Sequence, residues 1–356
     1  MTTIVTTGGS SRHELVQLAG QGQPLPSPVE AYFEVANRCN SKCATCPLTF
    51  SPQENAKQLS LEEFKILVDQ LPDLRRAVMQ GIGEPLLNRE LAPMIRHLKQ
   101  RGVYVVFNTN AALLTRRRQE ELIDCGLDEL RVSVDGSTPE TYRKVRGIPV
   151  FDRVVANVAE MVRTQRELGS STPRLSLWVT GIRENLSELP DVVDLAARIG
   201  VAEVYLQRMV FGFSDDGVDK TLARADESIY DQQYRAQAEA FIDEAERRAN
   251  AHGIRFRGAD ALSPRESIVD RPPIAEPWRA CSRPLRLAYV TAQGTALPCC
   301  IAPFTDASYE SIVLGNYLRD SVQAVWTGEA YRAFRERLYS SDPPASCRNC
   351  GLSWSL

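Results

Sequence analysis

Short apolar runs alternate with amphipathic stretches between residues 31 and 210 of this 356-residue chain. Apolar, β-branched runs are typical of buried strands, whereas apolar residues three or four positions apart predict helices. The pattern predicts six strands, at 31–37, 75–85, 103–110, 129–136, 174–182 and 202–210. It predicts five intervening helices, at 60–71, 92–102, 116–126, 150–169 and 189–200. Strands that alternate with helices indicate parallel βαβ units. The predicted fold is therefore α/β, a partial (βα)6 TIM barrel that occupies residues 30–215.

Three further segments flank this predicted barrel. Residues 1–29 are rich in Gly, Ser, Thr and Pro, and they are expected to form a loose N-terminal arm with one short helical stretch. Residues 216–275 are polar and contain Pro, which indicates a helical connector around one helix at 233–250. Residues 276–356 are predicted to form a small C-terminal β-hairpin and helix domain, with two short strands around a Gly turn and a helix at 324–338.

Composition narrows the class of protein. The net charge is −3, which does not indicate a nucleic-acid partner held through phosphates. No apolar run is long enough to span a bilayer, so no membrane partner is expected. The first residues lack the basic start and apolar block of a secretory signal, and we expect a cytoplasmic protein. Thiols stay reduced there, so nine cysteines suggest metal binding or catalysis before disulfides.

Seven of the cysteines form two sets. The first set is Cys39, Cys43 and Cys46, in one loop after the first predicted strand, and the second is Cys281, Cys299, Cys347 and Cys350. Cys300 adjoins Cys299, and Cys125, at the end of a predicted helix, is expected to be a small core residue.

The first set favours an iron–sulfur cube over zinc. Structural zinc needs four Cys or His ligands on one ion, and no histidine lies near this loop in the sequence. Three thiolates from one loop leave one iron of a cube free to bind something else. Zinc is a stronger alternative for the second set, because four cysteines with a CxxC pair also suit that ion.

Polar residues gather at the ends of the predicted strands, where barrels of this kind carry their chemistry. The cysteine loop follows the first strand, and "GIGEP" (81–85) ends the second. Asn108, Ser133, Gln207 and Arg208 stand in the third, fourth and sixth strands.

The Cys-x3-Cys-x2-Cys loop together with "GIGEP" resembles the radical S-adenosylmethionine (SAM) superfamily. The resemblance implies that Cys39, Cys43 and Cys46 ligate a [4Fe–4S] cluster whose free iron binds SAM. It implies that Gly83 and Glu84 contact the methionine amino group. Asn108 and Ser133 would contact its carboxylate and ribose, and Gln207 would also face SAM. The chain departs from the family pattern at Thr45, where a larger residue often lies against adenine, and at Ile82, where a glycine is usual.

The second set resembles the C-terminal extension called SPASM, in its shortened "twitch" form. This resemblance implies one auxiliary [4Fe–4S] cluster with Cys281, Cys299, Cys347 and Cys350 as ligands. Cys299 is favoured over Cys300 because its spacing from Cys281 matches the shortened form.

The resemblance also implies an activity. An external one-electron reductant such as flavodoxin or ferredoxin would drive cleavage of SAM to a 5′-deoxyadenosyl radical, which removes a hydrogen atom from the substrate. We expect a small, hydroxyl-rich substrate of natural-product biosynthesis, such as a sugar, an aminocyclitol or a nucleoside. Oxidation is the expected outcome, because a fully ligated auxiliary cluster suits electron removal. In length and in its single auxiliary cluster, the chain is also similar to 2-deoxy-scyllo-inosamine dehydrogenases.

Several alternatives stay open from the sequence. Cys300 as a hydrogen donor would give epimerisation, and a carboxylate beside the radical would permit decarboxylation. The substrate would otherwise be a ribosomal peptide or a partner protein. A further alternative is a non-enzymatic iron–sulfur or zinc-binding module. It is less favoured, because such a module would not need the polar residues at the strand ends. Arg208 is a candidate substrate contact, and the basic run at 143–147 is a candidate anion site or simply a solvated face.

Overall fold

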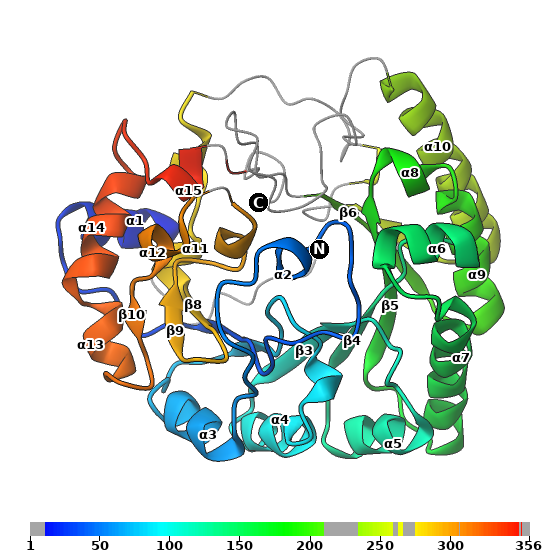
Figure 1. Cartoon of the computed structure of the whole chain (residues 1–356), viewed down its shortest axis with the longest axis horizontal. Coiled ribbons are helices and arrows are strands. Elements are labelled where there is room, and N and C mark those ends of the chain that lie inside the picture. Colours follow the sequence, from blue (N-terminus) through cyan, green and yellow to red (C-terminus); the bar gives the residue numbers. More distant parts are fainter. Residues whose placement is uncertain are drawn as a thin grey trace.

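The computed structural model describes residues 11–209, 234–258, 263–265, 275–305, 307–348 and 350. Ten strands form one sheet in the order β10-β9-β8-β1-β2-β3-β4-β5-β6-β7. The first six are β1 (Glu30–Phe33), β2 (Arg76–Val78), β3 (Tyr104–Thr109), β4 (Glu129–Ser133), β5 (Arg174–Gly181) and β6 (Glu203–Arg208). They pair in parallel as the alternating pattern predicts. The predicted α/β class and partial barrel are confirmed, and Figure 1 shows the strands as an open arc with helices outside it.

The helices between these strands lie where the pattern places them. The five predicted helices are α3 (Leu61–Asp69), α4 (Leu91–Gln100), α5 (Arg116–Asp124), α7 (Phe151–Glu167) and α9 (Leu189–Ile199). Shorter helices lie in the loops at the C-terminal ends of the strands: α2 (Pro47–Phe50), the 3-10 turn η1 (Pro85–Leu87), α6 (Pro139–Arg146) and α8 (Arg183–Leu186). Ser60 and Glu63 form a reciprocal capping box that starts α3.

A seventh parallel strand extends the barrel beyond the predicted six. Helix α10 (Arg235–His252) packs against α9, and β7 (Arg255–Arg257) then pairs in parallel with β6. The stretch 216–275, interpreted as a connector, therefore contains a further βα unit. The hydrophobic pattern does not reveal this unit, because three of the four buried residues of α10 are alanines and β7 reads Arg-Phe-Arg.

The C-terminal region continues the same sheet. Strand β8 (Leu287–Val290) pairs in parallel with β1 and antiparallel with β9 (Thr295–Leu297), and β9 pairs with β10 (Gly315–Asn316). The predicted hairpin is thus present, but it is built onto the edge of the barrel sheet. The remaining elements here are η5 (Pro277–Ala280), α11 (Arg283–Arg286), η6 (Ala302–Phe304), α12 (Tyr309–Ile312), α13 (Val322–Trp326), α14 (Glu329–Leu338) and α15 (Ala345–Arg348).

Two expectations for the ends of the chain are wrong in detail. The single helix predicted at 324–338 is divided into α13 and α14 at Gly328, where a side chain would lie 2.7 Å from the Ala324 carbonyl oxygen. Within the predicted loose arm, α1 (Arg12–Gly20) is packed against α14 and α11 through the buried residues Leu15 and Ala19. No helix in the described residues is long and apolar enough to cross a membrane.

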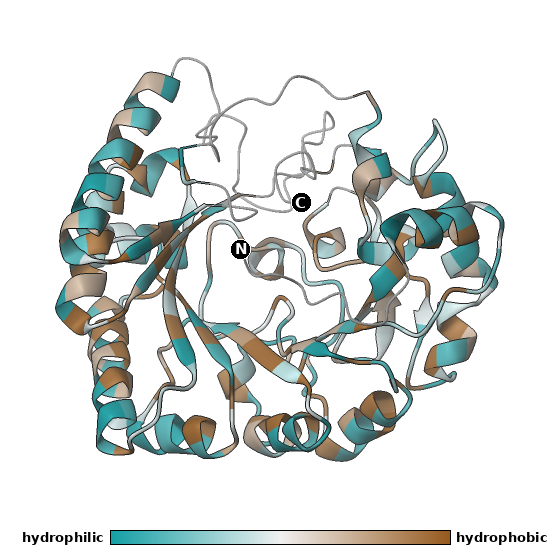
Figure 2. Ribbon diagram, turned by 180° about the vertical axis from the view of Figure 1, so that it is seen from behind, coloured by the Kyte–Doolittle hydropathy of each residue, from teal (hydrophilic) through white to brown (hydrophobic). Residues whose placement is uncertain are grey.

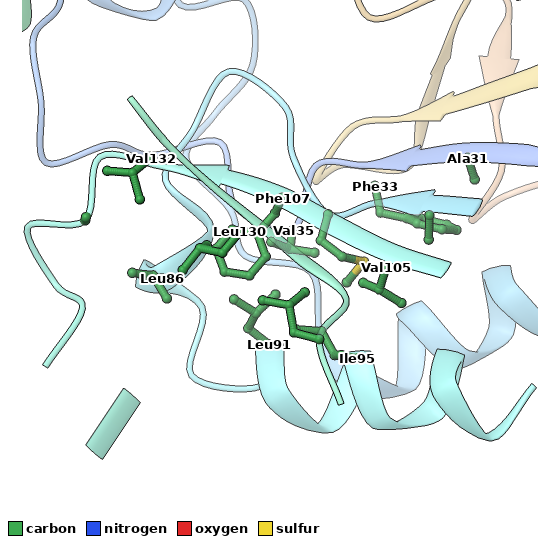
Figure 3. Close-up of a cluster of buried hydrophobic side chains, with 14 of the residues drawn as sticks. Ala31, Phe33, Val35, Leu86, Leu91, Ile95, Val105, Phe107, Leu130 and Val132 are labelled. Carbon is green, nitrogen blue, oxygen red and sulfur yellow. The ribbon is translucent and has the colours of Figure 1, made fainter. Parts of the chain in front are cut away.

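The two faces of the sheet differ in polarity because side chains alternate along each strand. The face toward the helices is apolar and fully buried, with Ala31, Phe33, Ala77, Val105, Phe107, Leu130, Val132, Leu177 and Val204. Figure 3 shows several of these side chains beside Leu91 and Ile95 of α4, and Figure 2 shows hydrophobic residues concentrated in the strands. The inner face carries the alternate residues, which are mostly polar or aromatic. Among them are Tyr32, Arg76, Asn108, Arg131, Ser133, Trp178, Tyr205, Gln207 and Tyr289.

Candidate radical SAM site and auxiliary cysteine set

The loop that carries Cys39, Cys43 and Cys46 is held from two sides by glycines. Gly83 lies so close to this loop that a Cβ would stand 1.9 Å from the Ala36 carbonyl oxygen. On the other side Gly147, which ends α6 with φ +71°, would place a Cβ 2.2 Å from the Lys42 carbonyl oxygen. Backbone hydrogen bonds fix both approaches, from Glu84 N to the Arg38 oxygen at 2.8 Å and from Lys42 N to the Arg146 oxygen at 3.2 Å.

The three thiols of this loop lie in a buried environment. Cys43 is 8% exposed, and burial raises the pKa of each thiol. The Cys39 sulfur accepts a hydrogen bond from Ser41 N at 3.3 Å and lies 3.8 Å from Asn110 Nδ2. The Cys46 sulfur lies 3.9 Å from the Ile82 carbonyl oxygen, so the cysteine loop and the "GIGEP" loop meet here.

The donor set fits a cluster better than a single ion. In the described part of the chain, no three Cys, His, Asp or Glu side chains converge as the ligands of one metal ion do. A cube binds each thiolate to a different iron, so its ligands need not converge on one point. The positive irons would also offset the cost of deprotonating buried thiols.

Glu84 connects the loop after β2 to the end of β3. The carboxylate is 2% exposed, and burial raises its pKa. Its Oε1 accepts hydrogen bonds from the Thr109 hydroxyl at 2.7 Å and from Leu86 N at 3.0 Å, while Oε2 accepts from Asn110 N at 2.8 Å. The Glu84 side chain therefore holds the loop after β2 against the end of β3. This role does not depend on the predicted contact with the amino group of SAM.

Asn110 is a residue that the sequence analysis missed. Its Nδ2 donates to Asn40 Oδ1 at 2.8 Å and to the Ser41 hydroxyl at 3.1 Å, so it ties the end of β3 to the cysteine loop. The signal was present in "NTN" (108–110), where a second asparagine follows at the same strand end.

The other predicted SAM contacts share the inner face of the barrel. Asn108 Oδ1 is buried without a hydrogen-bond partner, as expected for an atom that awaits a ligand. Ser133 ends β4, and Gln207 pairs with Thr180 in the layer above Tyr205. Arg208 ends β6, and its side chain lies outside the described residues.

A stack of cations and aromatic rings lies on the inner face beside these residues. The Arg131 guanidinium lies 4.4 Å from the centre of the Trp178 ring, which stacks on Tyr205 at 3.9 Å. The Arg257 guanidinium lies 5.6 Å from the centre of the Tyr205 ring. In the sheet, Asn108 pairs with Arg131 and Ser133 pairs with Trp178, so the stack is at the level of these two residues, and Gln207 lies two positions beyond Tyr205 on β6.

The basic run at 143–147 divides into two environments. Arg143 and Lys144 are exposed, as a solvated face requires, whereas Arg146 turns inward and pairs with Asp135 at 3.0 Å. Burial opposes its charge, but the neighbouring Cys43, Asp135 and Tyr142 outweigh that effect and raise the pKa of Arg146. Arg146 Nε is buried without a partner, so this guanidinium is a candidate for binding an anion beside the cysteine loop.

The second cysteine set lies beyond β9. Cys281 packs with Leu338 and with the partly buried Cys347 and Cys350. Burial and then the charges of Cys299, Cys281 and Cys350 raise the pKa of Cys347. Cys299 and Cys300 both pack against the cluster of Leu287, Tyr289 and Leu297, and the charge of Cys300 contributes to the raised pKa of Cys281. Burial raises the pKa of Cys300 to about 11, and Arg283, Cys299 and Tyr32 are its charged or hydrogen-bonding neighbours.

Cys125 is a core residue, as expected. It is 2% exposed, and its thiol donates to the Leu122 carbonyl oxygen at 3.3 Å.

A small pocket lies between the loop that carries Cys46 and the β8–β9 hairpin, which Cys299 follows. We call it the barrel–hairpin pocket. One wall is formed by Asn37, Pro47, Leu48 and Ile82, next to Cys46, and the other by Tyr289, Thr291, Leu297 and Tyr309, near Cys299. Glu34 and Glu54 also line it. Glu54 Oε1 accepts hydrogen bonds from the hydroxyls of Thr291, Thr295 and Tyr309, at 3.0, 2.6 and 2.6 Å.

Comparisons with known proteins agree with this architecture. Residues 33–196 match the radical SAM superfamily, and residues 281–351 match the SPASM iron–sulfur cluster-binding domain. The AdoMet-dependent heme synthase of Methanosarcina barkeri is 24% identical over 326 residues, 90% of this chain and 86% of that protein. The tungsten-containing aldehyde ferredoxin oxidoreductase cofactor-modifying protein of Pyrococcus furiosus is 24% identical over 333 residues, with the same shares of 90% and 86%.

A solved structure shows the same fold. Streptococcus suis SuiB bound to its precursor peptide SuiA matches with a TM-score of 0.66 and 14% identity, over 96% of this chain and 73% of that chain. At that identity the likeness concerns the fold alone.

These findings give the two domains their cofactors. A radical SAM domain binds a [4Fe–4S] cluster and SAM, and a SPASM domain binds auxiliary iron–sulfur clusters. The two matches together span about two thirds of the 356 residues, and each contains one of the cysteine sets. The chain belongs to the radical SAM superfamily and carries a C-terminal SPASM domain.

Proposed function

We propose that this enzyme oxidises an alcohol carbon of a small, hydroxyl-rich substrate, such as an aminocyclitol, a sugar or a nucleoside of natural-product biosynthesis. The substrate would bind in the barrel–hairpin pocket. One observation carries the proposal: this pocket lies between the loop that carries Cys46 and the hairpin that precedes Cys299, and carboxylates, hydroxyls and two amides line it together with apolar side chains. None of the described residues that line it is a cysteine, whereas Cys300 is directed to Tyr32 and Arg283. That placement favours oxidation over an epimerisation with Cys300 as hydrogen donor.

The chain's own residues have distinct tasks in this proposal. Cys39, Cys43 and Cys46 would hold the first cluster, and Cys281, Cys299, Cys347 and Cys350 the auxiliary one. When bound, these groups and SAM supply a 5′-deoxyadenosyl radical and a one-electron acceptor. Asn108, Ser133 and Gln207 would hold SAM beside the cation–aromatic stack, and the Arg146 guanidinium would bind its carboxylate. An external reductant such as flavodoxin or ferredoxin would deliver the first electron.

The test follows the hydrogen atom. Reconstituted enzyme, SAM and dithionite are incubated anaerobically with 2-deoxy-scyllo-inosamine that carries deuterium on its carbinol carbons. The expected result is deuterium in 5′-deoxyadenosine and a product that lacks two hydrogen atoms.

Parallel incubations distinguish the alternatives. A product of unchanged mass but inverted configuration would indicate epimerisation, and release of CO2 from a carboxylated sugar would indicate decarboxylation. Deuterium transfer from a ribosomal peptide panel, and from none of the small molecules, would overturn the proposal in favour of peptide modification.

A further inference from the structure

Glu34 is a buried carboxylate that neither cysteine set uses. It follows β1 directly, is 2% exposed, and lines the barrel–hairpin pocket. Its Oε1 accepts a hydrogen bond from Ile82 N at 2.8 Å, in the "GIGEP" loop, and its Oε2 accepts one from Ala292 N at 3.3 Å, in the β8–β9 turn. The carboxylate therefore connects the loop after β2, on the side of the first cysteine set, with the β8–β9 turn, on the side of the second set.

Each oxygen of Glu34 accepts one backbone hydrogen bond and keeps a second lone pair. Two backbone amides fix the orientation of the carboxylate, and Gly81 leaves room for it, since a Cβ at that position would lie 2.3 Å from Oε1. A fixed acceptor at the wall of a pocket, with capacity left for one more donor, is the arrangement that a general base requires.

We propose that Glu34 is the catalytic base that accepts the hydroxyl proton of the substrate radical. This inference rests on the oxidation proposed above. After the carbinol hydrogen atom is removed, the substrate carries an unpaired electron on the carbon that bears its O–H group. The proton of that O–H goes to Glu34, and one electron goes to the acceptor that the SPASM domain's iron–sulfur cluster supplies. The C–O bond becomes C=O, so the substrate loses two protons and two electrons in all, which is equivalent to two hydrogen atoms.

The surroundings of Glu34 suit a base that works near neutral pH. Burial raises the pKa of Glu34 to about 7. Its two backbone hydrogen bonds lower the pKa, and the negative charge of Glu54 raises it further. The other titratable groups that face it are Tyr289 on β8 and Tyr309 on α12, whose pKa values are raised by burial, so both stay neutral. The loop after β2 contributes the backbone amide of Ile82.

The test separates hydrogen abstraction from proton transfer. Wild type and Glu34→Gln are each given the deuterated aminocyclitol, and deuterium in 5′-deoxyadenosine is measured beside the oxidised product. Glu34→Gln has nearly the same volume and keeps an oxygen for Ile82 N, but its NH2 group faces Ala292 N, which loses its acceptor. It is expected to transfer deuterium at a rate within about threefold of wild type, while product formation falls roughly 100-fold or more, the usual loss for a general base.

The pH dependence identifies which carboxylate acts. In wild type, product formation is expected to rise as pH passes through about 7, because Glu34 must be ionised to accept a proton. Glu54→Gln removes the neighbouring negative charge, so this rise should move to lower pH. Glu34→Asp should retain part of the activity and the pH-dependent rise, which Glu34→Gln loses.

Three results would overturn the inference. Product formation by Glu34→Gln at the wild-type rate would exclude Glu34 as the base. A Glu34→Gln enzyme that loses SAM affinity and deuterium transfer together would show that the residue only holds the loops. Wild type that transfers no deuterium from the probe would remove the proposed oxidation, and the base with it.

Discussion

The Thr109 hydroxyl lies 2.7 Å from Glu84 Oε1, and this contact fastens the loop after β2 to the end of β3. Glu84→Gln would keep one acceptor oxygen and turn an NH2 group toward a backbone donor. We expect SAM affinity to fall at least about tenfold and the free energy of unfolding to fall by about 1–3 kcal/mol, the cost of an unsatisfied buried group. SAM binding is measured by the change it causes in the cluster's EPR spectrum.

Thr109→Val is the matched control for Glu84→Gln, because it leaves the Asn110 contact of Glu84 in place. It removes both hydrogen bonds of the Thr109 hydroxyl, which donates to Glu84 Oε1 and accepts from Ala111 N at 2.9 Å. The free energy of unfolding should fall by about 1–3 kcal/mol, because Ala111 N loses its acceptor. Wild-type SAM affinity in Glu84→Gln would contradict the organising role of this carboxylate.

Gly147 is expected to be required for assembly of the first cluster. Alanine there adds the cost of a left-handed backbone, about 1–2 kcal/mol, and places its Cβ 2.2 Å from the Lys42 oxygen in the cysteine loop. Gly147→Ala should therefore lose the iron of the first site and retain the auxiliary iron. Gly169→Ala is the control, because Gly169 has φ +62° but no atom within 4 Å of an added Cβ. It should lose similar stability and keep all its iron.

Much of the barrel could be predicted because most of its helices and strands show a hydrophobic periodicity within their own sequence. Helix α3, for example, buries Phe64, Leu67 and Val68 and begins at a capping box that is legible in the sequence. Strand β7 could not be predicted, because it reads Arg-Phe-Arg and lacks an apolar run. The break at Gly328 was also missed, because the apolar spacing runs on across the glycine although its own helix propensity is low.

The candidate site could likewise be predicted only in part. The cysteine sets were evident from the spacing of thiols within short segments. Glu34 was not, because its role depends on Ala292, which is 258 positions away in the chain. Asn110 binds Asn40 and Ser41, and Arg146 binds Asp135. These partners lie on other loops, so the roles of Asn110 and Arg146 could be assigned only from the structure.

The adjacent cysteines 299 and 300 are expected to differ in cluster binding. The spacing from Cys281 favours Cys299 as the ligand, and the Cys300 thiol has Tyr32 as a hydrogen-bonding neighbour. Two Cys-ligated cubes carry about eight irons per chain. Cys299→Ala should lose roughly four of them after anaerobic reconstitution, and Cys300→Ala should lose none. Loss of the auxiliary iron in Cys300→Ala, with retention in Cys299→Ala, would reverse the ligand assignment.

Glu129 is expected to make stability depend on pH. It is 3% exposed and pairs with Arg131 at 2.7 Å and Arg174 at 2.9 Å. Burial raises its pKa, but the two arginines outweigh burial and lower the pKa from 4.5 to about 2. Because the folded pKa lies below the unfolded one, the stabilisation is complete above about pH 4.5. It is lost as pH falls toward 2.

The measurement compares urea unfolding of wild type and Glu129→Gln at several pH values. The advantage of wild type should shrink by roughly 1 kcal/mol per pH unit below about 4.5. Its total is expected to be below about 3 kcal/mol, because Arg174 is 43% exposed and solvent screens its charge. Glu62→Gln, at a side chain that is 79% exposed, is the control. A constant difference between wild type and Glu129→Gln across this range would refute the expectation.

The pairing of β1 with β8 has a consequence for synthesis of the chain on the ribosome. One side of β1 stays open until residues 287–290 emerge, about 250 residues later. At about 5–20 residues per second, this takes roughly 10–50 s, during which the unpaired edge is available to other strands. The first cysteine set is made long before the wall that encloses its pocket, and Cys347 follows Cys46 by about 300 residues. An iron–sulfur carrier that loads the nascent chain would therefore meet the SAM site first, and a chaperone that shields β1 would have to leave before the auxiliary site can close.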